Sequence, residues 1–265
     1  MILIEKSPRG DLVTITLNRP ERKNALNQQL VVELTEAIEE ISDDETVRII
    51  VLTGAGDVFS AGADLKALEA MQSASYGDNL DDSQRLADLF LAIRRCPQPV
   101  IARVNGHAIA GGFGLVSACD FSVADERARF GFTEVRIGFI PAIVMAFLRY
   151  RLTDLHLRNV LLRGVLLTAR EAQSIGLINR IVDTERLDEA VRTLADEIVR
   201  ETSPQAVAAT KRMLFEIQRS SHDEGLAIAV ERNAQMRNMP DCQAGIRAFL
   251  NREDPPWKTS FDEQS

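Results

Sequence analysis

Hydrophobic and polar residues alternate strictly near the start of the chain. Val13, Ile15 and Leu17 are separated by threonines, and the turn-forming residues 7–10 precede them. Alternation with a period of two predicts a β-strand with one buried face, and the turn joins it to a strand at residues 2–4. The chain is therefore expected to open with a β-hairpin.

Further along, apolar residues recur at helical spacing between short apolar runs. A helix is expected to follow Asn27, which can cap it, because its apolar positions fall on one face: Leu30, Leu34, Ile38 and Ile41. Buried strands are predicted at 47–53, 100–104 and 121–124. Residues 72–83 are polar, contain a glycine and lack a steady apolar period, which predicts a mobile flap between two helical pieces.

The order of these elements indicates the fold class. A unit of two strands and a helix recurs without a simple sequence repeat, which favours stacked ββα turns over a doubly wound sheet. From about Leu187 the pattern becomes almost wholly helical, and Ser203-Pro204 is typical of a helix start. We expect an α/β core over residues 1–200 and a helical region over 201–265 that packs on the core or on another subunit.

Composition narrows the class of protein. The 265 residues are 45% hydrophobic and carry a formal net charge of -8, which disfavours a nucleic-acid-binding face, and no basic stretch is interleaved with aromatic residues. Cys96, Cys119 and Cys242 are unclustered and lack metal-binding spacing. The start of the chain has no signal-peptide pattern, and no apolar run reaches the roughly 18 residues that span a bilayer. We expect a soluble cytoplasmic protein without a metal, a membrane contact or a nucleic-acid partner.

Two segments rich in small residues lie directly before predicted helices: SAGADLK at 60–66 and NGHAIAGGFG at 105–114. Small side chains let a ligand approach the backbone, and the first N–H groups of a helix are free to donate. Two such donors that converge on one point form an oxyanion hole. For either segment taken alone, a purely structural role is favoured, in which the glycines permit tight turns and close packing.

A carboxylate is the remaining candidate for proton transfer. The chain lacks GxxxxGK[ST], GxGxxG, GxSxG and HExxH, and its histidines are scattered. Glu134 lies among apolar and small residues in FGFTEVRIG, where desolvation would raise its pKa toward neutrality and suit it to general acid–base catalysis. The alternative is that Glu134 pairs with Arg129 or Arg136 near a surface loop.

Four ordered motifs together resemble one family. They are LNRPERKNALN at 17–27, FSAGADLK at 59–66, NGHAIAGGFGLVSACD at 105–120 and FGFTEVRIGFIP at 130–141. In order and spacing they resemble the enoyl-CoA hydratase/isomerase, or crotonase, superfamily. The resemblance implies an α/β spiral of ββα turns with a C-terminal helical trimerisation region, often within a hexamer. It also implies an acyl-CoA thioester substrate, with coenzyme A part of that substrate and no other cofactor.

The resemblance also implies roles for particular residues. Ala63 and Gly111 would donate their N–H groups to the thioester carbonyl, and Glu134 would move protons. The adenine end of coenzyme A is expected among a set of neighbouring residues: Ala25, Ala61, Asp64, Leu65 and Lys66. Its phosphates could meet Arg22 or Lys23, for which solvated surface charge is the alternative role. Two further positions match residues that reach the coenzyme A site of a neighbouring subunit: Phe249 and Arg252.

One position departs from the family pattern. Hydratases of this family often use two glutamates; Glu134 matches the second, and the first would fall at Gly114. One hypothesis is a hydratase resembling the methylglutaconyl-CoA hydratases, which share this glycine and a stretch similar to residues 133–142. The other is a Δ3,Δ2-enoyl-CoA isomerase, in which one glutamate shuttles one proton. Hydratase or lyase activity is favoured, and a non-catalytic oligomer that binds CoA esters or RNA is a third alternative.

Overall fold

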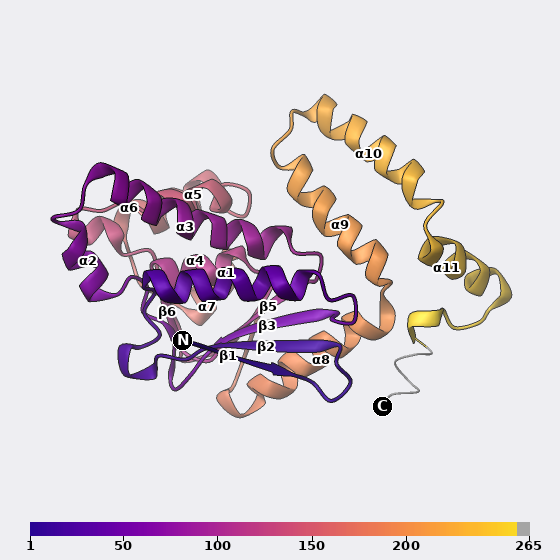
Figure 1. Ribbon diagram of the computed structural model, residues 1–265, viewed down its shortest axis with the longest axis horizontal. Coiled ribbons are helices and arrows are strands. Elements are labelled where there is room, and N and C mark those ends of the chain that lie inside the picture. The colour runs from indigo at the N-terminus through magenta and orange to yellow at the C-terminus, as the bar shows by residue number, and fades with distance from the viewer. Residues whose placement is uncertain (259–265) are drawn as a thin grey trace.

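The computed structural model describes residues 1–258 and contains two β-sheets (Figure 1). The larger has six strands in the order β1-β2-β3-β5-β7-β10, and the smaller has four in the order β4-β6-β8-β9. The bounds of the first set are Ile2–Lys6, Leu12–Leu17, Ile49–Gly54, Val100–Val104, Phe121–Asp125 and Arg180–Val182. Those of the second are Val58–Ser60, His107–Ile109, Arg129–Gly131 and Leu167–Thr168.

From β3 to β8, successive strands alternate between the two sheets, which confirms the predicted spiral. The pairs β3–β4, β5–β6 and β7–β8 each send one strand to the large sheet and the next to the small one. Within the large sheet β2, β3, β5, β7 and β10 run parallel, and only β1 pairs antiparallel with β2. The chain therefore forms stacked ββα turns rather than a doubly wound sheet.

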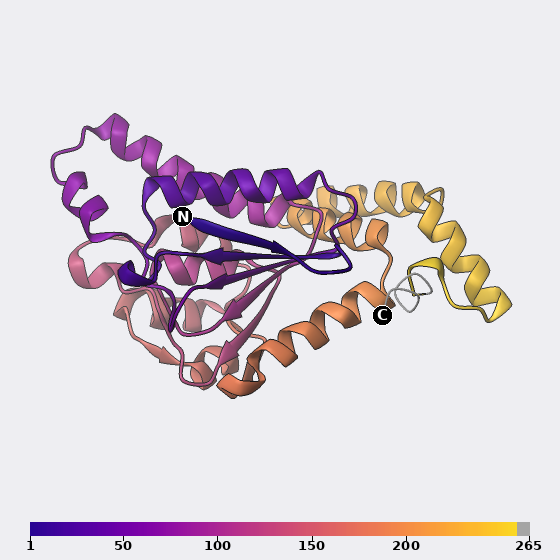
Figure 2. The same ribbon diagram turned by 60° about the horizontal axis from the view of Figure 1, so that its bottom comes forward.

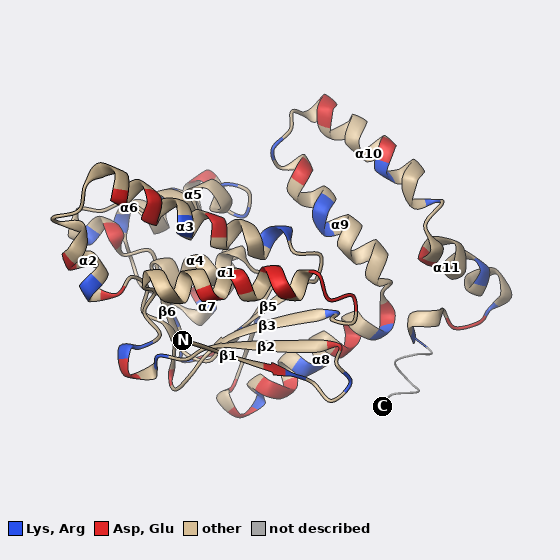
Figure 3. Cartoon of the chain, in the orientation of Figure 1, with Lys and Arg blue, Asp and Glu red and all other residues tan. Residues whose placement is uncertain are grey.

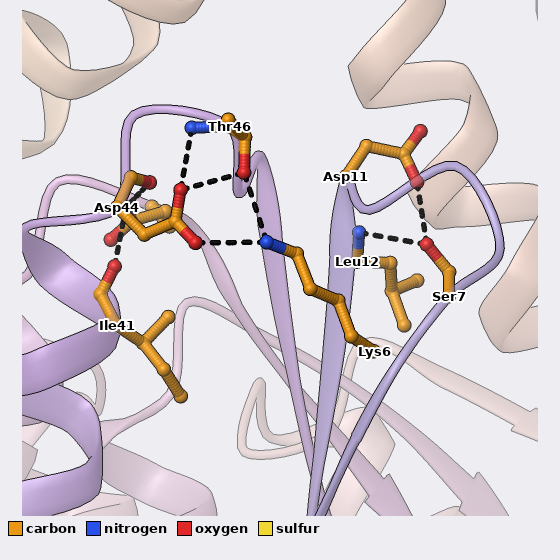
Figure 4. A network of polar contacts seen from close by, with 8 residues as sticks. Lys6, Ser7, Asp11, Leu12, Ile41, Asp44 and Thr46 are labelled. Carbon is orange, nitrogen blue, oxygen red and sulfur yellow. Dashed lines mark hydrogen bonds and ion pairs between the residues drawn. The ribbon is translucent and has the colours of Figure 1, made fainter.

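The opening hairpin has the predicted form and is fastened at its turn. Ser7 Oγ donates to Asp11 at 2.9 Å and accepts from the Leu12 amide at 3.2 Å (Figure 4). At the end of β1, Lys6 Nζ lies 2.9 Å from Asp44 in the loop before β3. Hydrogen bonds to Asp44 from Lys6 and then from Thr46 lower its pKa to about 2. The hairpin is thereby tied to the next turn of the spiral.

Helices cover both faces of the large sheet (Figure 2). Asn27 caps α1 (Gln28–Ser42), as predicted, by accepting from the Leu30 amide. Ile50 and Leu52 of β3 belong to the core shared with α1 and α3 (Tyr76–Arg95). The alternate residues of β3 pack instead with α8 (Leu187–Glu201) on the other face. Burial on both faces explains the continuous apolar run of this parallel strand.

The expected flap over residues 72–83 is wrong for most of its length. Only a short connection at 72–75 follows α2 (Leu65–Met71), and α3 begins at Tyr76. Ser75 and Asp78 form a reciprocal capping box that starts the helix. The apolar period is missing because only the C-terminal half of α3 buries side chains in the core. A half-exposed helix needs no continuous apolar face.

The C-terminal part is helical, as predicted, and extends away from the sheets (Figure 1). After α8 come α9 (Pro204–Ile217), α10 (His222–Met236) and α11 (Pro240–Asn251). Ser203 caps α9, and Pro204 occupies its first turn. The helices of residues 1–258 include none that is long and apolar enough to cross a membrane. Residues 259–265, the end of the predicted helical region, lie outside the described residues.

Lys211 anchors α9 to the core. This lysine is 8% exposed, and its ammonium group lies 2.6 Å from Asp120. It also donates to the carbonyl oxygens of Gln98 at 2.8 Å and Ile93 at 3.0 Å. Asp120 in turn accepts from the Val100 amide at the start of β5. One buried cation thus joins α9 to the end of α3 and to the large sheet.

Lys211→Ala should destabilise the protein by about 3 kcal/mol, because it leaves Asp120 and two buried carbonyl groups without their partner. Urea unfolding measures the loss. Arg212→Ala is the matched control, since the neighbouring arginine is exposed, and should change stability by no more than about 0.5 kcal/mol. Equal stability of the two variants would show that Lys211 is not an anchor.

Candidate active site

The first motif and the second are clamped together by backbone hydrogen bonds. Leu26 N donates to Gly62 O at 2.7 Å, and Asp64 N donates back to Leu26 O at 2.9 Å. Ala61 N donates to Lys23 O at 2.9 Å. Ala63 thus lies on a short parallel bridge opposite Leu26, and its position is set on both sides.

Two polar side chains that sequence analysis missed support this clamp. Asn24 is fully buried and donates to the carbonyl groups of Ala55 at 2.8 Å and Val58 at 2.7 Å. Arg19 donates to Asp64 at 2.8 Å and to the Ala25 carbonyl. The only sequence signal was a group of polar residues inside the first motif. Their partners lie about 30 to 45 residues away, so local patterns do not reveal the contacts.

The second glycine-rich segment meets this loop at the start of α4 (Gly111–Ala118). A Cβ on Gly62 would lie 2.7 Å from Ile109 O and 3.4 Å from Gly111 N, and one on Gly112 would lie 2.5 Å from Ser60 O. Such approaches exclude side chains. Ala110 has a φ of 49° and donates to Gly131 O at 2.7 Å, which holds the helix start in a strained conformation.

This contact brings the two predicted amide donors into the same region. Gly111 is the first residue of α4, where an N–H has no partner within the helix. Among residues 1–258, neither the Ala63 amide nor the Gly111 amide donates to a protein acceptor. Ala63 itself is exposed. The arrangement can present two backbone N–H groups to one ligand oxygen, the chemistry of an oxyanion hole.

Glu134 lies at the start of a single 3-10 turn, Glu134–Ile137. Its Oε2 atom is buried and has no hydrogen-bond partner, and within residues 1–258 the side chain forms no ion pair. The alternative of pairing with Arg129 or Arg136 is therefore wrong. Burial raises the pKa of Glu134 above its ordinary value. A carboxylate in this state is suited to accept and return a proton.

An aromatic stack joins this turn to α4. The Phe113 ring lies 4.8 Å from the Phe132 ring in a stacked arrangement and 5.0 Å from the Phe130 ring. All three rings are fully buried. Phe113 lies two residues after Gly111, and Phe132 lies two residues before Glu134. The stack therefore fixes the carboxylate relative to the start of α4.

Gly114 has no room for a side chain. A Cβ at this position would lie 2.7 Å from the Phe90 ring and 2.9 Å from a Val144 methyl group, the latter from α5 (Ala142–Leu148). Both neighbours are buried. The space at residue 114, where the family resemblance would place a first glutamate, is therefore filled by the core.

A cavity of about 740 Å³ lies beside α2 and the start of α1. Its lining includes Arg19, Arg22, Asp64 and Lys66. Two residues assigned to coenzyme A from the sequence, Asp64 and Lys66, therefore come together with Arg22, a candidate contact for its phosphates. The Asp64 carboxylate is engaged internally, because it accepts from Arg19 and from the Lys66 amide. The other assigned residues lie next to this set in the chain: Ala25, Ala61 and the exposed Leu65.

Two assigned residues lie elsewhere in the chain's own fold. Phe249 is 83% exposed on α11, and Arg252 follows it at the end of that helix. Figures 1 and 2 both place α11 at the opposite end of the molecule from α2. One chain does not bring Phe249 and Arg252 to the cavity, so their role at a neighbouring subunit's site stays a prediction.

Comparison with known proteins identifies the family. The family model for enoyl-CoA hydratase/isomerase matches residues 9–260. A candidate enoyl-CoA hydratase of Thermus thermophilus is 38% identical over 96% of this chain and 99% of its own, and the 2,3-dehydroadipyl-CoA hydratase of Escherichia coli is 32% identical over 93% and 95%. An enoyl-CoA hydratase structure from Mycobacterium smegmatis superposes with a TM-score of 0.91 at 33% identity. The match covers 97% of this chain and 98% of that structure's chain.

The chain belongs to the enoyl-CoA hydratase/isomerase family and has the crotonase fold. It is an enzyme of this family that acts on acyl-CoA.

Substitutions at Gly114 test whether the core excludes a second glutamate. Gly114→Ala should lower stability by about 1–3 kcal/mol through overpacking, Gly114→Glu should lower it further, and neither should speed hydration. Thermal unfolding and a hydration assay measure both effects. Gly77→Ala is the control, because a Cβ on that helical glycine would meet only Ser75 Oγ, at an ordinary contact distance of 3.6 Å, and should be stabilising by up to about 1 kcal/mol. Faster hydration by a folded Gly114→Glu enzyme would contradict the packing argument.

Proposed function

We propose that the protein is an enoyl-CoA hydratase that uses one glutamate. The observation that carries this proposal is the buried, unpartnered Oε2 of Glu134, held by an aromatic stack near two free backbone donors. The Ala63 and Gly111 amides stabilise negative charge on the thioester oxygen. Water then attacks C3 while Glu134 accepts its proton, and the neutral acid returns a proton to C2. Water is thereby added across the double bond.

The second candidate is a Δ3,Δ2-enoyl-CoA isomerase. The absence of space at residue 114 favours it, because moving one proton between C2 and C4 needs only Glu134. The hydratase names of the relatives favour hydration. Residues 133–142, the glycine at 114 and the E. coli relative named for dehydroadipyl-CoA all favour an acyl group that is branched or carries a carboxylate. That carboxylate would help to orient water in place of the missing glutamate.

The coenzyme A part of the substrate is assigned to the cavity beside α2. Arg22 and Lys66 offer positive charge to its phosphates there, and the proposed chemistry uses no cofactor beyond the substrate. A homotrimer or hexamer completes the proposal. Exposed apolar side chains after Glu134 and on α11 support assembly, since large exposed apolar groups commonly mark interfaces: Ile137, Phe139, Ile140, Phe249 and Leu250.

Incubation with a panel of straight, branched and carboxylated enoyl-CoA thioesters tests the activity, with products resolved by mass. Hydration adds the mass of one water, whereas isomerisation leaves the mass unchanged and moves the double bond. We expect a gain of water with branched or carboxylated substrates and little with crotonyl-CoA. Isobaric products alone would establish the isomerase, and no turnover of any thioester would leave only CoA-ester binding.

Glu134→Gln should lower turnover at least about 100-fold, whereas Glu126→Gln, the same change at an exposed position, should not.

The same Glu134→Gln substitution should raise the stability of the folded protein. Since burial raises the pKa of Glu134, its ionisation destabilises the fold, and this cost is absent below the ordinary carboxyl pKa of about 4.3. The melting temperature of Glu134→Gln should exceed the parent's at pH 8, with the difference shrinking toward pH 5. Normal turnover would remove Glu134 from the mechanism.

A further inference from the structure

Five arginines gather where α3, α9 and the segment after α5 meet. They come from the end of α3, from residues 149–151 and from the end of α9 (Figure 3). We define them with three aromatic residues as the arginine–aromatic patch: Arg94, Arg95, Arg149, Arg151, Arg219, Phe147, Tyr150 and Phe215. Residues 147–151 interleave aromatic and basic side chains along the chain, and folding adds the other members of the patch from α3 and α9.

Phe215 is the centre of the patch. Three guanidinium groups lie against its ring: those of Arg95 and Arg219 at 5.4 Å from the centroid and that of Arg94 at 5.8 Å. Arg94 also lies 5.2 Å from the Phe147 ring. Groups that share one ring lie close to one another, so an aromatic face here concentrates positive charge.

The patch has no internal counter-charge. Among residues 1–258, none of its five arginines forms an ion pair. The carboxylate that attracts both Arg94 and Arg151 is that of Asp120, and Lys211 already pairs with it at 2.6 Å. Glu216 pairs with Arg232 instead. These unpaired cations repel one another, although the chain as a whole has a net charge of -8. A bound anion would reduce that repulsion.

Two sets of observations indicate how the patch is built. Arg94 is held in place, since it donates to Gln218 and its Nε is buried without a partner. Burial and the neighbouring Arg151 lower the pKa of Arg94. Arg95, Arg149 and Arg219 are exposed and are free to contact a ligand. The patch thus combines a fixed, partly buried charge with exposed charges around it.

We propose that the arginine–aromatic patch binds an oligophosphate anion at a site separate from the acyl-CoA cavity. A carboxylate carries one charge and satisfies one guanidinium, whereas a diphosphate offers several charges and enough oxygens for bidentate contacts with two or more arginines. The acyl-CoA cavity lies at the start of α1 and beside α2, at the other end of the α1–α3 pair (Figure 1). The patch is therefore an additional site, independent of the proposed reaction.

Titration calorimetry with inorganic pyrophosphate tests the proposal on the full-length protein. The double variant Arg95→Ala/Arg219→Ala should bind at least about 100-fold more weakly, because each arginine supplies charge-assisted hydrogen bonds. Arg170→Ala/Arg192→Ala removes the same charge from two exposed positions on α7 (Ala169–Ser174) and α8 and should bind like the parent. Equal weakening in both double variants would show a bulk charge effect and overturn the site.

Two further measurements test the shared ring and the independence of the patch from the acyl-CoA cavity. Phe215→Leu keeps every charge but removes the ring, and should weaken pyrophosphate binding about 10-fold; unchanged binding would contradict the role of the ring. Saturating coenzyme A should leave pyrophosphate bound, and the Arg95→Ala/Arg219→Ala enzyme should keep its turnover of acyl-CoA. Displacement by coenzyme A would make the patch a substrate subsite and overturn its independence, whatever the reaction proves to be.

Discussion

The contact between the loop at 60–64 and the first turn of α4 is the constraint on which the candidate site depends. Backbone meets backbone there, and a Cβ on Gly62 or Gly112 would lie within 3 Å of a carbonyl oxygen. Only small residues allow this approach. The same contact brings the first turn of α4 close to Gly62, the neighbour of Ala63, and among residues 1–258 neither the Ala63 nor the Gly111 amide donates to a protein acceptor. Close packing and ligand-binding capacity therefore arise from one feature of the chain.

The position of Glu134 shows the energetic conflict common to acid–base sites. A carboxylate with a buried oxygen and no partner costs stability, because burial disfavours its charged form. The surrounding structure offsets that cost through apolar packing, which includes the stack of Phe113 on Phe132, two residues before Glu134 in the chain. An ion pair with Arg129 or Arg136 would have relieved the conflict. It would also have lowered the pKa that proton transfer requires.

Local patterns predicted the elements whose causes are local. The hairpin, the Asn27 cap and the Ser203-Pro204 helix start follow from neighbouring residues, and the ordered motifs indicated the family. The first turns of α3 were missed because half of that helix has no buried face to produce a period. The Arg19–Asp64 pair was missed because its partners are far apart in sequence. The backbone of the candidate site could therefore be predicted from local motifs, whereas the side chains that hold it could not.

The shortage of carboxylates at the junction of α3 and α9 explains two features of the structure. It explains how α9 is attached to the core and why unpaired arginines gather beside it. The junction of α3 with α9 holds six cations, Lys211 and the five arginines of the patch, and the Asp120 carboxylate attracts three of them: Lys211, Arg94 and Arg151. Lys211 is the most deeply buried of these cations and takes that carboxylate, since an unpaired charge costs most where solvent is excluded. The more exposed arginines then rely on water and on aromatic rings. Fastening α9 through a single carboxylate thus leaves a concentrated positive charge on an otherwise acidic protein.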